Sequence, residues 1–220
     1  RGMVAGFALP LLVFSIPPIA RLVWIRLHTF EKRRTPLNLR RAAMHIAHLG
    51  ILLLLVGHVF TTTLVQRGNP NHVVMLPRDA PIEHGGYWYT FTDLSTTDDV
   101  EVGDGLIEVS IEIRAERDGP VLTTMTPGML RFDEGGIPAR SETDTWHRWQ
   151  GDLIIIFDVD QANTLGLASF MQSGEEVDRI RVTIYDLTGS HLVWAGWILT
   201  LIGTSLNWLM APSVSRDEEE

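Results

Sequence analysis

The chain has 220 residues, no cysteine and a formal net charge of -9 at pH 7. A chain without cysteine forms no disulfide, zinc–thiolate site or iron–sulfur cluster, and it has no thiol nucleophile. The acidic charge argues against nucleic acid as a partner, because phosphates would be repelled. The apolar residues gather toward the two ends of the chain, which is not how a single soluble domain distributes them.

Residues 1–27 predict a first transmembrane helix. The apolar segment contains Pro17-Pro18, which removes two backbone donors and is expected to kink the helix. Membrane helices tolerate such prolines better than soluble helices do. Arg21 and Arg26 are expected to extend their long side chains to the nearer membrane surface.

Residues 28–41 predict a basic cytoplasmic loop, because a short connection rich in Lys and Arg stays inside. Its only acidic residue is Glu31. The basic residues are Lys32, Arg33, Arg34, Arg40 and Arg41. Residues 42–65 predict a second transmembrane helix, which at about 1.5 Å per residue crosses a hydrocarbon core of about 30 Å.

Residues 192–210 predict a third transmembrane helix, with Trp194, Trp197 and Trp208 as anchors at the membrane interfaces. An acidic tail, residues 211–220, then returns to the cytoplasm. Three spans place the amino terminus and the middle of the chain on the extracytoplasmic side. We expect a multi-pass protein of a lipid bilayer, in a bacterial or archaeal plasma membrane or the mitochondrial inner membrane.

Residues 66–191 predict an acidic extracytoplasmic domain made of β-strands. The segment has 9 Arg and no Lys against 22 Asp and Glu. Around residues 107–114 apolar and polar residues alternate, as in a half-buried strand. Asp118-Gly119 indicates a hairpin after that strand, residues 153–157 a fully buried strand, and residues 180–184 another alternating one. We expect an antiparallel β-sandwich or barrel-like domain.

Three histidines, His45, His48 and His58, lie in the second predicted span. A titratable side chain within hydrocarbon indicates a functional site. His45 and His48 are three residues apart and share a helix face, and a neutral imidazole is a good axial ligand for haem iron. Ala47 and Gly50 leave room beside His48 for a flat macrocycle or another helix. The alternative is that His45 reaches the headgroups while His48 bonds a neighbouring helix.

His58 lies ten residues beyond His48, about 15 Å along the axis and about 80° around the helix. That separation is compatible with two haems at different depths, but the angle favours an interfacial position for His58. The other histidines we discuss, His72, His84, His147 and His191, are expected to be solvated or structural.

Two further local patterns leave alternatives open. An acidic stretch is either a solvated loop, the favoured interpretation, or a calcium site; it comprises Asp93, Asp98, Asp99, Glu101 and Asp104. Trp146 and Trp149 flank His147 and Arg148 on a predicted exposed loop. These aromatic side chains either dock a haem propionate edge or a peptide, or cap the β core against the membrane surface.

The string Ala43-Met44-His45-Ile46-Ala47-His48-Leu49-Gly50 resembles the Gly-Met-x-x-Ala-His-x-Gly motif of CcmF-type cytochrome c haem lyases, in the carboxy-terminal third of that family. Ala43 stands where the family has its first Gly. Further similarities follow in the same order. They are Gly85-Gly86-Tyr87, Arg131-Phe132, Gly151-Asp152-Leu153 and the Trp-rich last helix from Leu192 to Gly203.

The resemblance implies a role in System I cytochrome c maturation, in which haem is joined to the thiols of an apocytochrome. By this resemblance His48 is an axial ligand of a membrane-embedded b-type haem. The implied partners are apocytochrome c, a haem chaperone and a membrane chain that carries the family's Trp-rich haem-handling segment and the second axial ligand. We expect one part of a split lyase, not catalytically competent alone.

The family's Pro-Thr-Thr-Glu loop is matched only loosely, by Ala139-Arg140-Ser141-Glu142. Two other functions remain open. One is a structural or accessory subunit of a respiratory or assembly complex, with no haem of its own. The other is a b-type electron-transfer subunit that uses His48 and His58.

Overall fold

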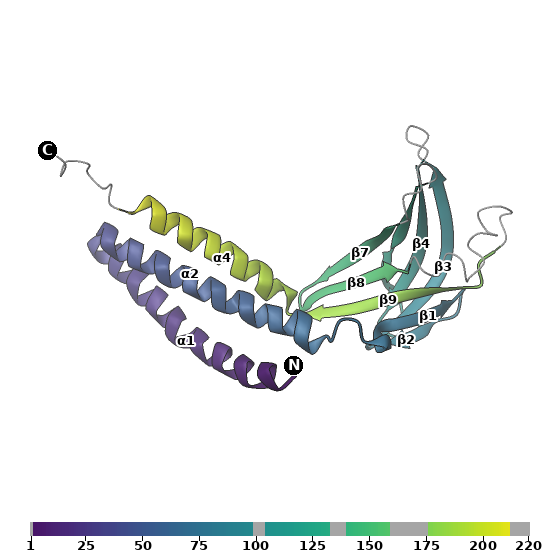
Figure 1. Ribbon diagram of the computed structural model, residues 1–220, viewed down its shortest axis with the longest axis horizontal. Coiled ribbons are helices and arrows are strands. Elements are labelled where there is room, and N and C mark those ends of the chain that lie inside the picture. The colour runs from purple at the N-terminus through teal and green to yellow at the C-terminus, as the bar shows by residue number, and fades with distance from the viewer. Residues whose placement is uncertain (1, 99–103, 133–139, 159–175, 212–220) are drawn as a thin grey trace. The chain divides into compact units, whose positions relative to one another are not determined.

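The computed structural model describes residues 2–98, 104–132, 140–158 and 176–211. The chain divides into two compact units, which we call the helical unit (Arg1–Val65 with Thr188–Glu220) and the β unit (Gln66–Leu187). Figure 1 shows the elements of each. The predicted fold class, three transmembrane helices with one antiparallel β domain, is confirmed.

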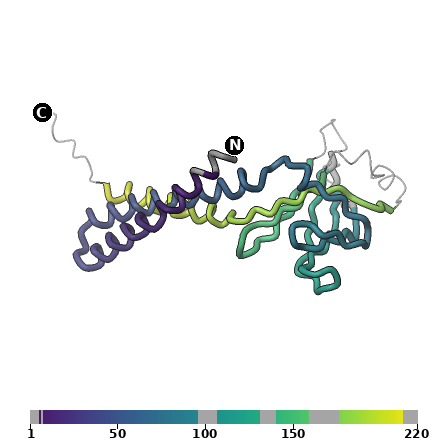
Figure 2. The backbone as a smooth tube through the Cα atoms, turned by 90° about the horizontal axis from the view of Figure 1, so that it is seen from below, coloured from purple at the N-terminus to yellow at the C-terminus, as the bar shows by residue number. Residues whose placement is uncertain are grey.

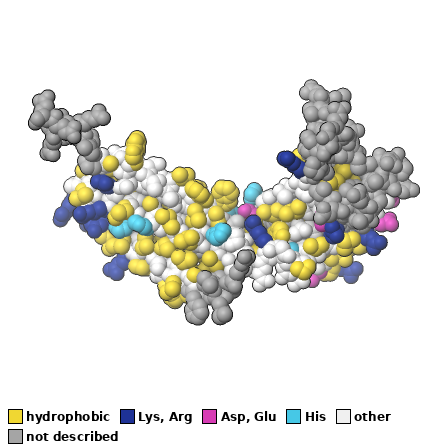
Figure 3. Space-filling view, in the orientation of Figure 1, with side chains coloured by type: hydrophobic (Ala, Val, Ile, Leu, Met, Phe, Trp, Pro, Cys, Tyr) yellow, Lys and Arg dark blue, Asp and Glu magenta, His cyan; other side chains and the backbone are white. Residues whose placement is uncertain are grey.

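The helical unit consists of α1 (Gly2–Arg33), α2 (Pro36–His58) and α4 (Ser190–Leu209). A π-helical turn, η1 (Val59–Leu64), continues α2. The apolar segments within these helices are 26, 29 and 20 residues long, enough to cross a membrane. Apolar side chains cover much of the unit's visible face (Figure 3). Lipid, not protein, is the solvent that suits such a surface.

The basic segment 28–41 is helical at both ends and is not a loop. α1 continues past Leu27 to Arg33, and only Arg34 and Thr35 separate it from α2. Pro36 begins α2 without loss of a hydrogen bond, because the first N–H groups of a helix have no partner within it.

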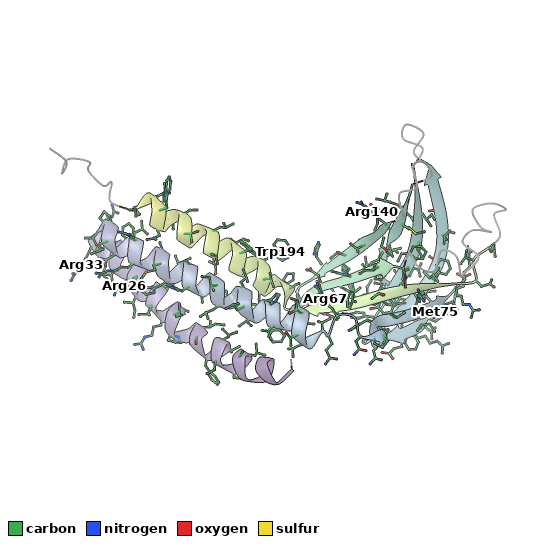
Figure 4. All side chains as sticks on the ribbon, viewed as in Figure 1. Arg26, Arg33, Arg67, Met75, Arg140 and Trp194 are labelled. Carbon is green, nitrogen blue, oxygen red and sulfur yellow. The ribbon has the colours of Figure 1, made fainter. Side chains whose placement is uncertain are left out.

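α1 runs as one helix through Pro10, Pro17 and Pro18. Arg26 and Arg33 lie toward one end of the helical unit, and Trp194 lies toward the other (Figure 4). Trp194 is 63% exposed, as an interfacial anchor requires.

The middle helix of the unit is α2, which packs against both α1 and α4 (Figures 1 and 2). Glycines bring α2 and α4 into backbone contact. A Cβ atom added to Gly50 would lie 2.5 Å from the Thr200 nitrogen, and one added to Gly203 would overlap Ala47. Small residues of this kind are typical of helix pairs in membranes, where close packing replaces the hydrophobic effect.

The described residues of the β unit form nine strands. Their bounds are β1 (Val73–Pro77), β2 (Ile82–His84), β3 (Tyr87–Asp98), β4 (Asp104–Arg114), β5 (Val121–Met125), β6 (Gly128–Phe132), β7 (Arg140–Arg148), β8 (Gly151–Phe157) and β9 (Arg179–Thr188). A short 3-10 helix, η2 (Pro70–His72), precedes them. The strand order is β1-β9-β8-β7-β6-β4-β3-β2, with β5 also paired to β4. Antiparallel pairing joins β1 to β9, β2 to β3, β3 to β4, β4 to β5, β4 to β6, β6 to β7 and β7 to β8.

The sheet curls until its first and later strands meet, which gives a nearly closed barrel. The Asp79 N–H donates to the Phe91 oxygen at 2.8 Å, and Arg78 bridges to Phe91, so the end of β1 joins β3. The hairpin predicted at Asp118-Gly119 joins β4 to β5, with Glu112 opposite Thr124. Closure leaves few unpaired strand edges.

The core of the β unit is formed by inward-facing residues that alternate along the strands, as the sequence predicts for β4 and β9. In β8 a fully buried strand was expected, but Ile154 and Ile156 are only partly buried. In β4 the buried residues are Ile107, Val109, Ile111 and Ile113. β8 and β9 contribute Leu153, Ile155, Phe157, Ile180, Val182 and Ile184. This apolar interior holds the turns between strands in fixed positions, including the β7–β8 turn discussed below.

Candidate functional site

One side of α2 is not covered by any other described part of the chain. The exposed residues of α2 after Pro36 recur every three or four positions, which places them along one side of the helix. We call them the open face of α2; they are Leu37, Arg41, Met44, His48, Ile51, Leu55 and His58. Histidine side chains are visible on this unit in Figure 3.

His48 lies in the middle of the open face, and its imidazole is held in one tautomer. The Nδ1 atom is 2.8 Å from the backbone oxygen of Met44, one helical turn earlier. A carbonyl oxygen only accepts, so Nδ1 carries the proton and Nε2 keeps its lone pair. A hydrogen bond of this kind orients many metal-binding histidines. The exposed ring of His48 can therefore serve as a ligand.

His45 and His48 lie within electrostatic range of each other, in agreement with the predicted shared face, but the two side chains differ in exposure. His48 is exposed, whereas His45 is partly buried and within electrostatic range of Arg26 of α1. The helical unit therefore uses the two imidazoles differently. His45 belongs to the side of α2 near α1, and His48 to the open face.

Of the two uses expected for the small size of Ala47 and Gly50, the close approach of another helix is the one observed. Both residues lie on the side of α2 that packs on α4, against Gly203 and against Gly196 and Thr200 respectively. Their small size is used by the helix pair, so a macrocycle beside His48 would meet larger apolar residues of the open face.

His58 lies on the same open face as His48, at the end of α2. Its backbone oxygen accepts a hydrogen bond of 2.5 Å from the Thr62 hydroxyl in η1. His48 and His58 are both exposed although an ideal helix separates them by about 80°. The open face is broad enough around the helix to include both.

In the β unit, two histidines pack on tyrosines. The His72 ring centroid is 4.9 Å from that of Tyr185, and the His84 centroid is 6.4 Å from that of Tyr89. Burial lowers the pKa of His84, and the nearby His72 lowers it further, while Glu83 opposes both. These contacts fit the structural role expected from the sequence.

The predicted exposed loop at Trp146–Trp149 is the end of β7 followed by a tight turn, since residues 146–148 are strand and the turn is Trp149-Gln150, and Arg148 is not exposed. Its side chain is 4% exposed and pairs with Asp186 of β9 at 2.8 Å. The guanidinium carbon lies 5.5 Å from the Tyr87 ring centroid and 5.6 Å from that of Trp146. Burial lowers the pKa of Arg148, but hydrogen bonds to Asp186 and Tyr87 outweigh it and raise the pKa.

The pairing of His147 with Asp152 across this turn was not predicted from the sequence. The His147 Nδ1 atom lies 2.8 Å from Asp152 Oδ1, and the two residues are directly opposite each other in the β7–β8 pair. The pairing could have been predicted from the short connection Trp149-Gln150, because a two-residue hairpin loop places residues 147 and 152 opposite each other.

The predicted acidic loop is wrong at its two ends, because Asp93 and Asp98 lie in β3 and Asp104 begins β4. Asp99 and Glu101 lie outside the described residues, as does Ala139 of the loosely matched Ala139–Glu142 loop. Within the described part of the chain, no three His, Cys, Asp or Glu side chains form a group that could hold a metal ion.

No protein-family model and no curated protein matches the chain. The chain is similar to a solved structure of the protein "Cytochrome c Heme Lyase CcmF", with a TM-score of 0.59 and 16% sequence identity. The match covers 94% of this chain and 34% of that one, so the chain spans about a third of the protein that it resembles. At this identity the likeness shows the fold, which both units share with that lyase.

Proposed function

We propose that this chain is a membrane subunit of a cytochrome c haem lyase and that His48 is an axial ligand of a b-type haem. One observation carries the proposal: the exposed His48 imidazole donates from Nδ1 to Met44 and keeps Nε2 for a ligand. The fold likeness to a protein named as a haem lyase supports the same assignment. The haem iron supplies a one-electron redox centre when bound.

The residues around His48 fit a porphyrin. Met44, Ile51 and Leu55 are exposed neighbours on the open face of α2 and offer apolar contact to a macrocycle. Neutral imidazole at a dry, apolar site is a ligand that haem iron accepts. The two exposed histidines of α2 lie on the open face, which no other described part of the chain covers. The second axial ligand is therefore proposed to come from a partner membrane chain.

The proposed partner chain also carries the haem-handling segment of the lyase. The match covers only 34% of the similar protein, which leaves room for such a chain in the assembly. Apocytochrome c and a haem chaperone complete the proposed set of partners. This chain contributes a haem ligand and a β unit, and ligation of haem to a cytochrome is not proposed for it alone.

We place the β unit on the extracytoplasmic side. The basic ends of α1 and α2 belong in the cytoplasm by the positive-inside rule. The acidic segment 66–191 would then lie on the side where apocytochrome arrives, and its charge suits a basic partner.

A haem spectrum of the purified complex tests the role of His48. In the His48→Ala variant the b-type absorption of the reduced complex should fall to background. His45→Ala, which removes a partly buried imidazole three residues away, serves as the matched control and should retain the haem. Full b-type absorption in the His48→Ala complex would exclude this ligand.

A second candidate, a b-type electron-transfer subunit, is favoured by the position of His58. It shares the open face with His48 and lies about 15 Å further along the helix, a separation that suits a second haem. Loss of a second haem in His58→Ala would support this function. A complex that contains no haem at all would support the structural or accessory role.

A further inference from the structure

The β7–β8 turn holds a second oriented imidazole, that of His147. Its side chain is 75% exposed, whereas that of its partner Asp152 is 10% exposed. A carboxylate accepts the Nδ1–H proton of a neutral imidazole, so the Nε2 lone pair of His147 is directed away from Asp152. A buried carboxylate behind an exposed histidine is the arrangement that orients metal-binding imidazoles.

A hollow beside the turn is lined by this histidine and by aromatic residues. The hollow has a volume of about 290 Å³ and is lined by Tyr87, Trp146, His147, Arg148, Trp149 and Gln150. Trp149 is 90% exposed, which is unusual for so large an apolar ring. The residues around Trp149 are held by specific contacts. Arg148 lies near the rings of Tyr87 and Trp146, and the Gln150 amide donates to the Tyr87 hydroxyl at 3.3 Å.

The number of metal-binding side chains at this turn limits which kind of metal can bind. A bare transition metal ion needs three or four protein ligands, and no such group of side chains occurs among the described residues. A single imidazole suffices when the metal already carries four equatorial ligands, as iron does in a porphyrin. Flat aromatic ligands also stack on exposed indole rings.

We propose that His147 and Trp149 form a second metalloporphyrin site, on the β unit and independent of His48. The Nε2 atom of His147 coordinates the iron in place of an axial water, and Trp149 contacts the porphyrin face or edge. Arg148 does not bind the propionates, because its guanidinium is already engaged by Asp186. Asp152 is a positioning residue that acts through His147.

The shape of the hollow indicates how the porphyrin is held. Sites that enclose a ligand of drug size are roughly 300–1,000 Å³. A hollow of 290 Å³ is at the lower limit of that range, so the porphyrin rests against the turn with one side free. Such a site is suited to a haem that is passed on rather than retained.

The test uses the full chain in detergent micelles with His48→Ala in every variant, so the result does not depend on the proposed membrane haem. Ferric protoporphyrin IX is titrated and the Soret band is recorded. The parent should show the band of a histidine-ligated haem. Added His147→Ala should weaken binding by about tenfold or more and abolish that band, and free imidazole should restore it.

Three comparisons separate coordination from stacking. His191→Ala, which removes another exposed histidine, should leave the titration unchanged. Asp152→Asn should weaken binding by about 10- to 100-fold with the β unit still folded by circular dichroism. Metal-free protoporphyrin IX should bind weakly and equally to the parent and to His147→Ala. Equal affinity of the parent and His147→Ala for the ferric porphyrin would overturn the proposal.

Discussion

A Cβ atom added to Gly196 of α4 would lie 2.6 Å from the backbone oxygen of Gly50 on α2. Real Cβ atoms do not approach a backbone oxygen so closely, so the two helices depend on glycine at this crossing. Gly50 and Gly57 on α2, and Gly196 and Gly203 on α4, each recur after seven residues. This packing fixes which side of α2 faces α4, and so leaves His48 exposed.

Replacing Gly196 by alanine should therefore push α4 away from α2. Overpacking of this kind lowers the free energy of unfolding by about 1–3 kcal/mol. Gly6→Ala is the matched control, because an added Cβ there meets nothing within 4 Å and alanine favours a helix. Reversible unfolding in mixed micelles, followed by circular dichroism, measures both. Equal stability of the two variants would contradict the packing described.

A second prediction concerns Tyr89, which is 1% exposed in the core of the β unit. Burial is the main reason that its pKa is raised far above the ordinary value, because the phenolate would lose its hydration. In an alkaline titration Tyr89 should ionise only when the β unit unfolds. Tyr89→Phe should leave the phenolate absorbance before unfolding unchanged and reduce the step at unfolding. A smaller absorbance before unfolding would show that the phenol is accessible.

Hydropathy and periodicity were enough to predict the three helices and the alternating strands, because lipid or a core must cover each apolar face. β4 illustrates this, since its buried residues are those of the predicted alternation. The basic segment 28–41 was misjudged as a loop. Lys and Arg are good helix formers, so a basic composition gives the side of the membrane but not the end of a helix.

The site was only partly predictable. His48 was singled out as a candidate by its residue type, its depth and the resemblance of its motif to a known family, but its exposure depends on Gly196, which is far away in the sequence. The burial of Arg148 likewise depends on Asp186 in another strand. Contacts between distant segments are decided by the fold, and no local pattern encodes them.

The stability of the β unit should fall on mild acidification because of His84. Its folded pKa is lowered, chiefly by burial, so between the ordinary value of 6.5 and the folded pKa only the unfolded chain takes up the proton. Stability is complete above about pH 6.5 and is lost as the pH falls through that window. His84→Gln should flatten the dependence of the unfolding midpoint on pH. His72→Gln should reduce it only in part, because burial is the larger cause.

An unchanged pH dependence in His84→Gln would assign the loss of stability to other groups. His191→Gln is a suitable control, because this exposed histidine belongs to the helical unit. Its dependence of the unfolding midpoint on pH should match that of the parent.

The last prediction tests the ion pair that holds the β7–β8 turn. Arg148→Met keeps an unbranched apolar stem but removes the guanidinium, and with it the bond to Asp186 and the contacts with the Tyr87 and Trp146 rings. Breaking a buried pair lowers the free energy of unfolding by about 3–5 kcal/mol. We expect the lower end, about 3 kcal/mol, because the Asp186 side chain is 40% exposed and water can solvate it. Arg67→Met, at an exposed position of the same unit, is the control and should change the free energy of unfolding little. Denaturant unfolding measures both variants. An equally small effect for Arg148→Met would mean that the turn does not depend on this pair.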